Sequence, residues 1–185
     1  MFLPRSLAVR VAVLTFLVTG FCSGLSWNPA EIALEWPVPL LFGVAMTLFC
    51  RTRRSALAVA WLPISFAIWM IIYFSASWIS VILEHFARGP FPAFSVLGML
   101  GAALFAGAFS MLIRPLSWGE VGLLSAVGLI GGVAFAVTVE WDTKVGGTAP
   151  GFCLWQVAVG SRLVWLSVPE GDLSLPAKSV LNPGS

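Results

Sequence analysis

Arg162 and Gln156 stand well inside an apolar stretch of the sequence, the segment 151–168. A guanidinium group can hold a phosphate with two parallel hydrogen bonds, and an amide can both donate and accept. We therefore take these two residues as the ones that would contact a lipid headgroup or a substrate. Two other interpretations stay open. Arg162 could extend its charge to a membrane surface, and Gln156 could form a hydrogen bond between helices.

The sequence offers no arrangement of residues that is typical of a catalytic centre. Glu84 and His85 are neighbours, but adjacent residues point to different sides of a helix and do not form a working pair. Ser75, Ser77 and Ser80 lack a Gly-x-Ser-x-Gly context, and no apolar stretch contains a histidine or lysine that could serve as their base. We therefore expect no catalytic residues and favour a protein that is not an enzyme.

Metal and cofactor binding are also not expected. Cys22, Cys50 and Cys153 show no Cys-x-x-Cys spacing, and His85 is the single histidine of the chain. Cys22 and Cys153 could pair only if the first and last apolar segments are neighbours, and that alternative stays open. The net charge of +2, with one short arginine cluster, gives no indication of a nucleic-acid partner.

Small residues recur at spacings of three and four in two of the apolar segments. These residues are Gly98, Ala102 and Ala106 in the segment 93–113, and Gly128, Gly132 and Ala136 in the segment 119–139. Stripes of this kind let two helix backbones approach closely. We expect the two segments to pack as an antiparallel hairpin. The alternative is that one stripe is a docking face for a membrane-protein partner or for a second copy of the chain.

The composition indicates that lipid surrounds the elements that carry these residues. Hydrophobic residues make up 59% of the chain and charged residues only 10%, against about 25% charged in soluble domains. We predict an all-α, polytopic transmembrane bundle of about six spans that forms a single domain over residues 1–168. The predicted spans are 6–25, 32–50, 56–83, 93–113, 119–139 and 151–168, and a disordered tail follows over 169–185.

Three details of these spans depend on single features. The second span is too short from Pro37 onward, so residues 32–36 are expected to complete it. Pro63 removes a backbone donor inside the third span and predicts a kink there. The first span could instead be a signal peptide, because Arg5 and Arg10 precede a short apolar core, and its cleavage would leave five spans.

The distribution of positive charge predicts the orientation of the spans. With the N-terminus inside, the inner segments hold six arginines, namely Arg5, Arg10, Arg51, Arg53, Arg54 and Arg114, and the inner tail adds Lys178. The outer loops then hold only Arg88 and Lys144. Because lysine and arginine accumulate on the cytoplasmic side, we expect both termini to be cytoplasmic.

On these grounds the sequence favours a non-catalytic accessory, assembly or sensory component of a membrane. Its surroundings are the lipid bilayer, with a membrane-protein partner or homo-oligomer formed through the small-residue stripes. The first alternative is a small oligomeric permease for an apolar or weakly polar solute. The second, a lipid-acting enzyme, is the least favoured, because it would need polar groups that converge at one membrane face. The expected localisation is an integral, multi-pass membrane protein, in the plasma membrane if the cell is prokaryotic.

Overall fold

The computed structural model describes residues 5–26, 37–50, 57, 59–84, 91–141 and 149–168. Within these residues the chain forms six α-helices and no strand, which confirms the all-helical prediction. The helices are α1 (Arg5–Ser26), α2 (Pro37–Phe49), α3 (Trp61–Glu84), α4 (Phe91–Leu112), α5 (Trp118–Trp141) and α6 (Ala149–Ser167).

The bounds of α1, α4, α5 and α6 lie within two residues of the predicted spans, whereas α3 starts later than predicted. α2 starts at Pro37, and the predicted extension over 32–36 lies outside the described residues. α3 starts at Trp61 rather than at residue 56, which places Pro63 in its first turn. A proline is tolerated there because the first N–H groups of a helix have no intrahelical partner. This position removes the reason for the predicted kink.

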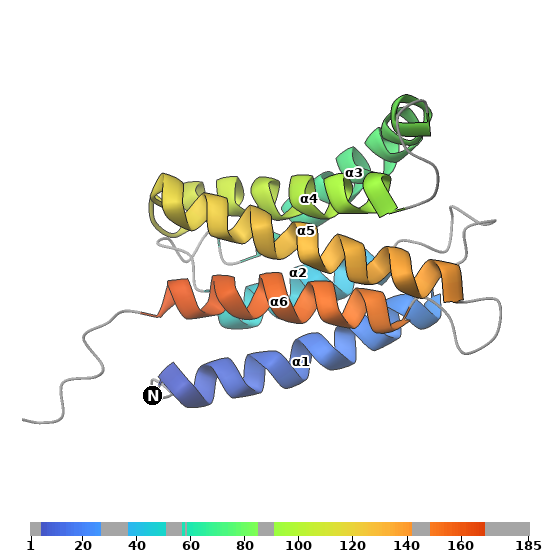
Figure 1. Cartoon of the computed structure of the whole chain (residues 1–185). Helices are drawn as coiled ribbons and strands as arrows, with labels where there is room; N and C mark the ends of the chain where they lie inside the picture. The colour runs from blue at the N-terminus through green and yellow to red at the C-terminus, as the bar shows by residue number, and fades with distance from the viewer. Residues whose placement is uncertain are drawn as a thin grey trace, which may run out of the picture.

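The helices form a ring in chain order (Figure 1). Each helix packs against the next one in sequence, and α1 packs against α6 to close the ring. The most extensive contacts are those between α4 and α5 and between α1 and α6. Successive helices run in opposite directions, so the start of α1 and the end of α6 lie at the same end of the bundle (Figure 1).

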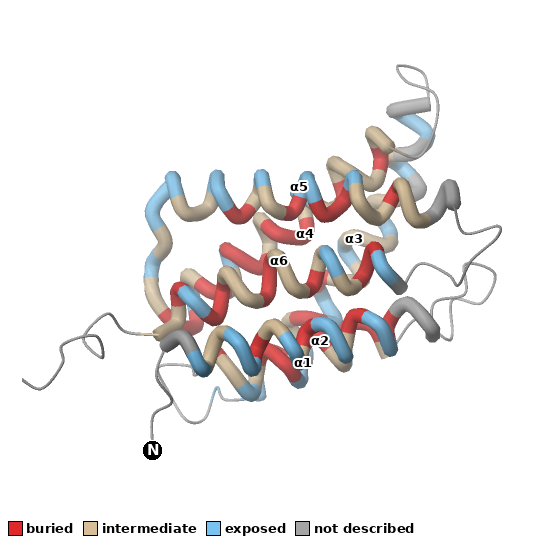
Figure 2. Tube along the Cα trace, turned by 60° about the horizontal axis from the view of Figure 1, so that its bottom comes forward, coloured by how far each residue is buried: buried red, intermediate tan, exposed pale blue. Residues whose placement is uncertain are grey.

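Aromatic rings fill the middle of the ring of helices. Phe42 of α2 lies 5.4 Å from Phe16 of α1, 4.8 Å from Phe105 of α4 and 5.7 Å from Trp155 of α6, measured between ring centroids. These are the separations at which tilted and edge-to-face ring pairs are favourable. Phe42 therefore joins four helices, and Figure 2 shows the buried positions turned toward this interior.

The outward faces of the helices are also apolar. Met111 and Trp118, which are 86% and 91% exposed, are the most exposed of many large hydrophobic side chains on the outside of the bundle. Two helical segments, Phe91–Leu112 and Trp118–Thr138, are long and apolar enough to cross a membrane, judged by length and composition. Three further apolar helices are shorter, namely Leu7–Ser23, Pro37–Phe49 and Trp61–Ala76.

Candidate ligand cavity

Gln156 lies in the contact between α1 and α6. Its carbonyl oxygen accepts a hydrogen bond from the Thr19 hydroxyl (2.9 Å), and its amide nitrogen donates one to the Ser23 hydroxyl (3.0 Å). The residue is only 1% exposed. A buried amide without partners would be costly, so these two bonds account for its position. The structure therefore places Gln156 between two helices, which is the second of the interpretations that the sequence left open.

Arg162 lies six residues beyond Gln156 on α6, or about 9 Å along the helix axis. Its side chain is half-buried, and its Nε is buried without a hydrogen-bond partner among the described residues. The only ion pair among those residues joins Arg114 to Glu120 (2.6 Å) and does not involve Arg162. The structure thus does not bring the two predicted contact residues, Arg162 and Gln156, together at one site.

The small-residue stripes lie in the contact between α4 and α5. A Cβ atom added to Gly98 would overlap the carbonyl oxygen of Gly128, and one added to Gly132 would overlap the carbonyl oxygen of Phe94. Ala102, Ala106 and Ala136 are fully buried. The two backbones are therefore in direct contact, and the stripe residues are covered within the chain rather than presented on its outside.

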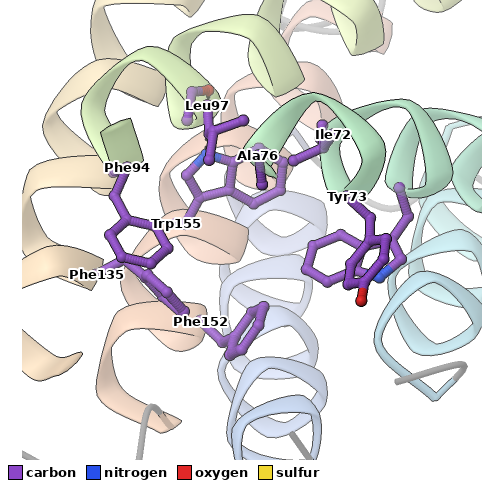
Figure 3. Close-up of a pocket in the computed structure, with 11 residues that line it drawn as sticks. Ile72, Tyr73, Ala76, Phe94, Leu97, Phe135, Phe152 and Trp155 are labelled. Atoms are coloured by element: carbon purple, nitrogen blue, oxygen red, sulfur yellow. Dashed lines mark hydrogen bonds between the residues drawn. The ribbon is translucent and has the colours of Figure 1, made fainter. Parts of the chain in front are cut away.

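A cavity of about 240 Å³ lies beside one end of this contact, between α3, α4, α5 and α6 (Figure 3). The residues that line it are mostly aromatic or aliphatic: Trp69, Ile72, Tyr73 and Ala76 of α3; Phe94, Leu97 and Gly98 of α4; Gly132 and Phe135 of α5; and Phe152 and Trp155 of α6. None of these residues is an acid, a histidine, a lysine or an arginine.

The cavity exists because α3 leans away from its neighbours beyond one close contact. The side chain of Ile72 packs on Gly101 of α4, where an added Cβ would lie 2.8 Å from the Ile72 Cδ1 atom. The C-terminal part of α3 rises away from α4 and α5 (Figure 1). The wall opposite α3 is a row of rings, in which Phe135 lies 4.9 Å from both Phe94 and Phe152.

Three of the lining residues carry a polar hydrogen on their side chains, namely Trp69, Tyr73 and Trp155. The indole N–H of Trp155 donates to the carbonyl oxygen of Gly98 (3.3 Å). The indole N–H of Trp69 is buried and has no hydrogen-bond partner among the described residues. The hydroxyl of Tyr73 likewise makes no hydrogen bond with a described residue, although its ring packs edge-on against Phe74. Both free donors therefore belong to α3.

A smaller cavity of about 20 Å³ lies next to the first one. The two share Trp69, Phe152 and Trp155 as lining residues, so these three rings separate them. Gln156 and Ser65 line only the smaller one. Gln156 therefore lies behind the aromatic rings that line the main cavity and is not part of the cavity surface. Arg162 lines neither cavity.

The turn between α4 and α5 holds the most extensive polar cluster of the described residues. Glu120 accepts hydrogen bonds from the Ser117 N–H (2.8 Å) and from Arg114, while the Glu120 N–H donates to the Ser117 hydroxyl (3.3 Å). This reciprocal pair is a capping box at the start of α5. Arg114 also donates to the carbonyl oxygen of Leu166 at the end of α6 (3.2 Å). The cluster thus ties α6 to the α4–α5 turn.

Sequence reasoning missed both this cluster and most of the cavity. The Ser-x-x-Glu spacing from Ser117 to Glu120 is a recognisable capping signal and could have been found. The cavity residues carry no comparable motif, although Gly98 and Gly132 were identified as packing residues. Among the described residues, no group of three or more His, Cys, Asp or Glu side chains could hold a metal ion, and the three cysteines are free thiols.

Comparisons with family models, with curated proteins and with solved structures give no match for this chain, so its function has to be inferred from its own residues.

Proposed function

We propose that the protein is a non-catalytic, multi-pass membrane protein that holds an apolar or weakly polar molecule between α3, α4, α5 and α6. The observation that carries this proposal is the uncharged, ring-lined cavity of about 240 Å³. An enclosed apolar cavity of about 150 Å³ stays dry and binds benzene, and this larger space, which opens on one side, suits an apolar molecule bigger than benzene. No carboxylate, imidazole or amine lines it, which favours binding over catalysis.

The outer surface supports the membrane part of the proposal. A helix that is apolar on all sides belongs either in the core of a large protein or in a bilayer. Here the apolar outward faces are exposed, as at Met111 and Ile130, and no other part of the described chain covers them. The two long apolar helices are of a length that spans a hydrocarbon core of about 30 Å. A cavity in such a bundle would be filled from the lipid phase.

Among the functions that the sequence left open, ligand binding in a sensor or small carrier fits the cavity best. An accessory role that depends on the small-residue stripes is less favoured, because these stripes are used between α4 and α5. A lipid-acting enzyme is also less favoured, because the polar clusters at Gln156 and at Glu120 are closed by their own hydrogen bonds.

The test is ¹⁹F NMR of 2-fluoronaphthalene with the full chain in lipid nanodiscs. We expect a protein-bound resonance that is separate from the signal of the probe dissolved in lipid. Replacing Ala76, which lines the cavity, by phenylalanine fills the space and should remove the bound resonance.

Ala67→Phe is the matched control, because Ala67 lies on the same helix at an exposed position outside the cavity. It should leave the bound resonance unchanged. The proposed function would be contradicted if the unmodified protein showed no bound resonance, or if the bound resonance persisted in Ala76→Phe.

A further inference from the structure

We infer that the ligand of the cavity is a neutral, mostly hydrocarbon molecule, and that the ring of Phe152 limits how far this molecule reaches into the bundle. The inference rests on the proposed function, and it adds the chemical class of the ligand and the residue that limits its size. It follows from the composition of the cavity wall and from the place of Phe152 between two separate spaces of the interior.

The cavity wall decides the chemical class of the ligand. None of the described residues that line the cavity is an acid, a histidine, a lysine or an arginine. A charged ligand would lose its hydration there and find no counter-charge, which costs far more than burying a hydrocarbon. The rings of Phe94, Phe135 and Phe152 instead favour contact with apolar groups and with flat rings. The wall therefore suits a neutral hydrocarbon.

Phe152 stands between the cavity and the smaller space of about 20 Å³. It lines both of them, together with Trp69 and Trp155. Its ring contacts Trp69 of α3, at 5.8 Å between ring centroids, and Phe135 of α5, at 4.9 Å. In the view of Figure 3 the Phe152 ring forms the lower edge of the cavity. A ligand that extends from the cavity toward the smaller space therefore meets this ring.

Phe152 is also the ring of this partition that can be removed with the least other change. The ring of Trp155 lies beside Gly101 and Gly131, where an added Cβ would be 3.2 Å and 2.8 Å from it. Its N–H bonds to Gly98, so Trp155 takes part in the packing of α6 on α4 and α5. The side chain of Phe152 is buried and carries no polar atom. Its truncation therefore leaves no side-chain donor or acceptor without a partner.

The smaller space behind the partition would also accept hydrocarbon. Apolar side chains such as Val38 and Phe42 form most of its wall. Ser65, which lines only this space, donates its hydroxyl hydrogen to the carbonyl oxygen of Pro39 (2.8 Å), and the amide of Gln156 is bonded to α1. Removing the Phe152 ring would therefore join two largely apolar spaces and admit a longer apolar ligand.

The experiment measures how the size of the ligand depends on Phe152. The probes are 2-fluoronaphthalene and 2-fluoroanthracene, which differ by one fused ring. Their affinities are measured by ¹⁹F NMR titration of the full chain in lipid nanodiscs, and partition into protein-free nanodiscs is subtracted. In Phe152→Ala the affinity for the anthracene probe, relative to that for the naphthalene probe, should rise by roughly tenfold, because an overpacked contact is relieved. Leu154→Ala, at an exposed position of α6 that lines neither space, should leave this ratio unchanged.

A further substitution locates the space that the longer probe gains. Val38 lines the smaller space but not the cavity, and Val38→Leu adds one methylene group there. Alone, this substitution should leave both affinities unchanged, because the Phe152 ring still separates the two spaces. Combined with Phe152→Ala, it should reduce the gain for the anthracene probe, a non-additive effect that is expected of groups that share one space. A gain of the same size with and without Val38→Leu would contradict the joining of the two spaces.

A charged analogue tests the chemical class of the ligand. 6-Fluoro-2-naphthoate has the ring system of the naphthalene probe and adds a carboxylate. It should bind at least about tenfold more weakly than 2-fluoronaphthalene, because no counter-charge lines the cavity. Equal affinity for the two probes would overturn the assignment of a neutral ligand.

The outcomes distinguish this inference from the proposed function on which it rests. If neither hydrocarbon probe binds to the unmodified protein, the proposed function fails. If 2-fluoronaphthalene binds but the ratio of affinities stays the same in Phe152→Ala, the cavity is a ligand site and the inference about Phe152 is wrong. If Phe152→Ala loses both probes because its fold is weakened, Phe152→Leu decides. A smaller rise of the ratio in that variant would support the inference, and an unchanged ratio would overturn it.

Discussion

At the scale of single residues, several polar side chains of this bundle join one helix to another. Gln156 uses both ends of its amide to hold two hydroxyls of α1, and the Nε1 of Trp61 donates to the carbonyl oxygen of Cys50 (3.1 Å) across the α2–α3 turn. In an apolar interior such bonds stabilise a contact because the unbonded alternative is costly. The sequence identified Gln156 as polar and buried, but only its neighbours decide which helix it faces.

Replacing Gln156 by leucine is expected to weaken the contact between α1 and α6. The change removes two interhelical hydrogen bonds, which together contribute about 1–2 kcal/mol in an apolar helix bundle. Thermal unfolding in detergent should show a lower Tm. Thr15→Val is the control, because the Thr15 hydroxyl bonds only within its own helix, to Val11. An unchanged Tm in Gln156→Leu would mean that these bonds do not hold α1 to α6.

Arg162 remains the residue that we expect to contact an anionic headgroup. It is a half-buried cation that has no carboxylate partner among the described residues. Arg162→Gln should therefore reduce the number of anionic phospholipids that stay bound in native mass spectra, whereas zwitterionic lipids should be unaffected. Arg10→Gln, at an exposed position, provides the comparison. Equal retention of anionic lipid by the Arg162 variant and by the unmodified protein would contradict this role.

At the scale of helices, the contact between α4 and α5 depends on the absence of side chains. Gly132→Ala should lower the free energy of unfolding by about 1–3 kcal/mol, because the new methyl group would overlap the backbone of Phe94 and force the helices apart. Gly107→Ala on α4 is the control, since nothing lies within 4 Å of its added Cβ. It should stabilise the helix slightly, by up to about 1 kcal/mol. Reversible unfolding in mixed micelles would measure both. If the two substitutions changed the free energy of unfolding equally, the close approach of the α4 and α5 backbones would not contribute to stability.

The sequence predicted the elements better than their arrangement. Long apolar runs that end at polar residues or prolines, such as Arg114-Pro115 after α4, place most helix ends within two residues. The late start of α3 was missed because apolar residues precede Trp61 without continuing the helix. The cavity was not predictable, since its size depends on how far α3 leans beyond Ile72. The cavity depends on the relative placement of four helices, α3 to α6, and the residue spacing within any one helix does not determine that placement.

At the scale of the whole molecule, the alternating helices and the positive charges together predict an orientation. In a chain without its native cysteines, Pro150→Cys at the start of α6 should react with a membrane-impermeant maleimide in intact cells. Ser117→Cys before α5 should react only after permeabilisation. Both positions are exposed and lie at opposite ends of the bundle, and the arginine-rich end is expected to face the cytoplasm. The reverse labelling pattern would show that the orientation is opposite to the predicted one. Equal labelling of both positions in intact cells would contradict a membrane-spanning bundle.

The pairing of α1 with α6 also has a consequence for biosynthesis. The ribosome completes α1 first and α6 last, and at about 5–20 residues per second about 7 to 28 seconds separate the two events. During that interval Thr19 and Ser23 have no Gln156 to bond with, and the Gly20 surface has no Cys153 to pack on. The last helix, α6, therefore closes the ring of helices. A chain that ends before α6 would lack the two hydrogen bonds of Gln156 and the close contact of Gly20 with Cys153, and with them the closure of the ring of helices.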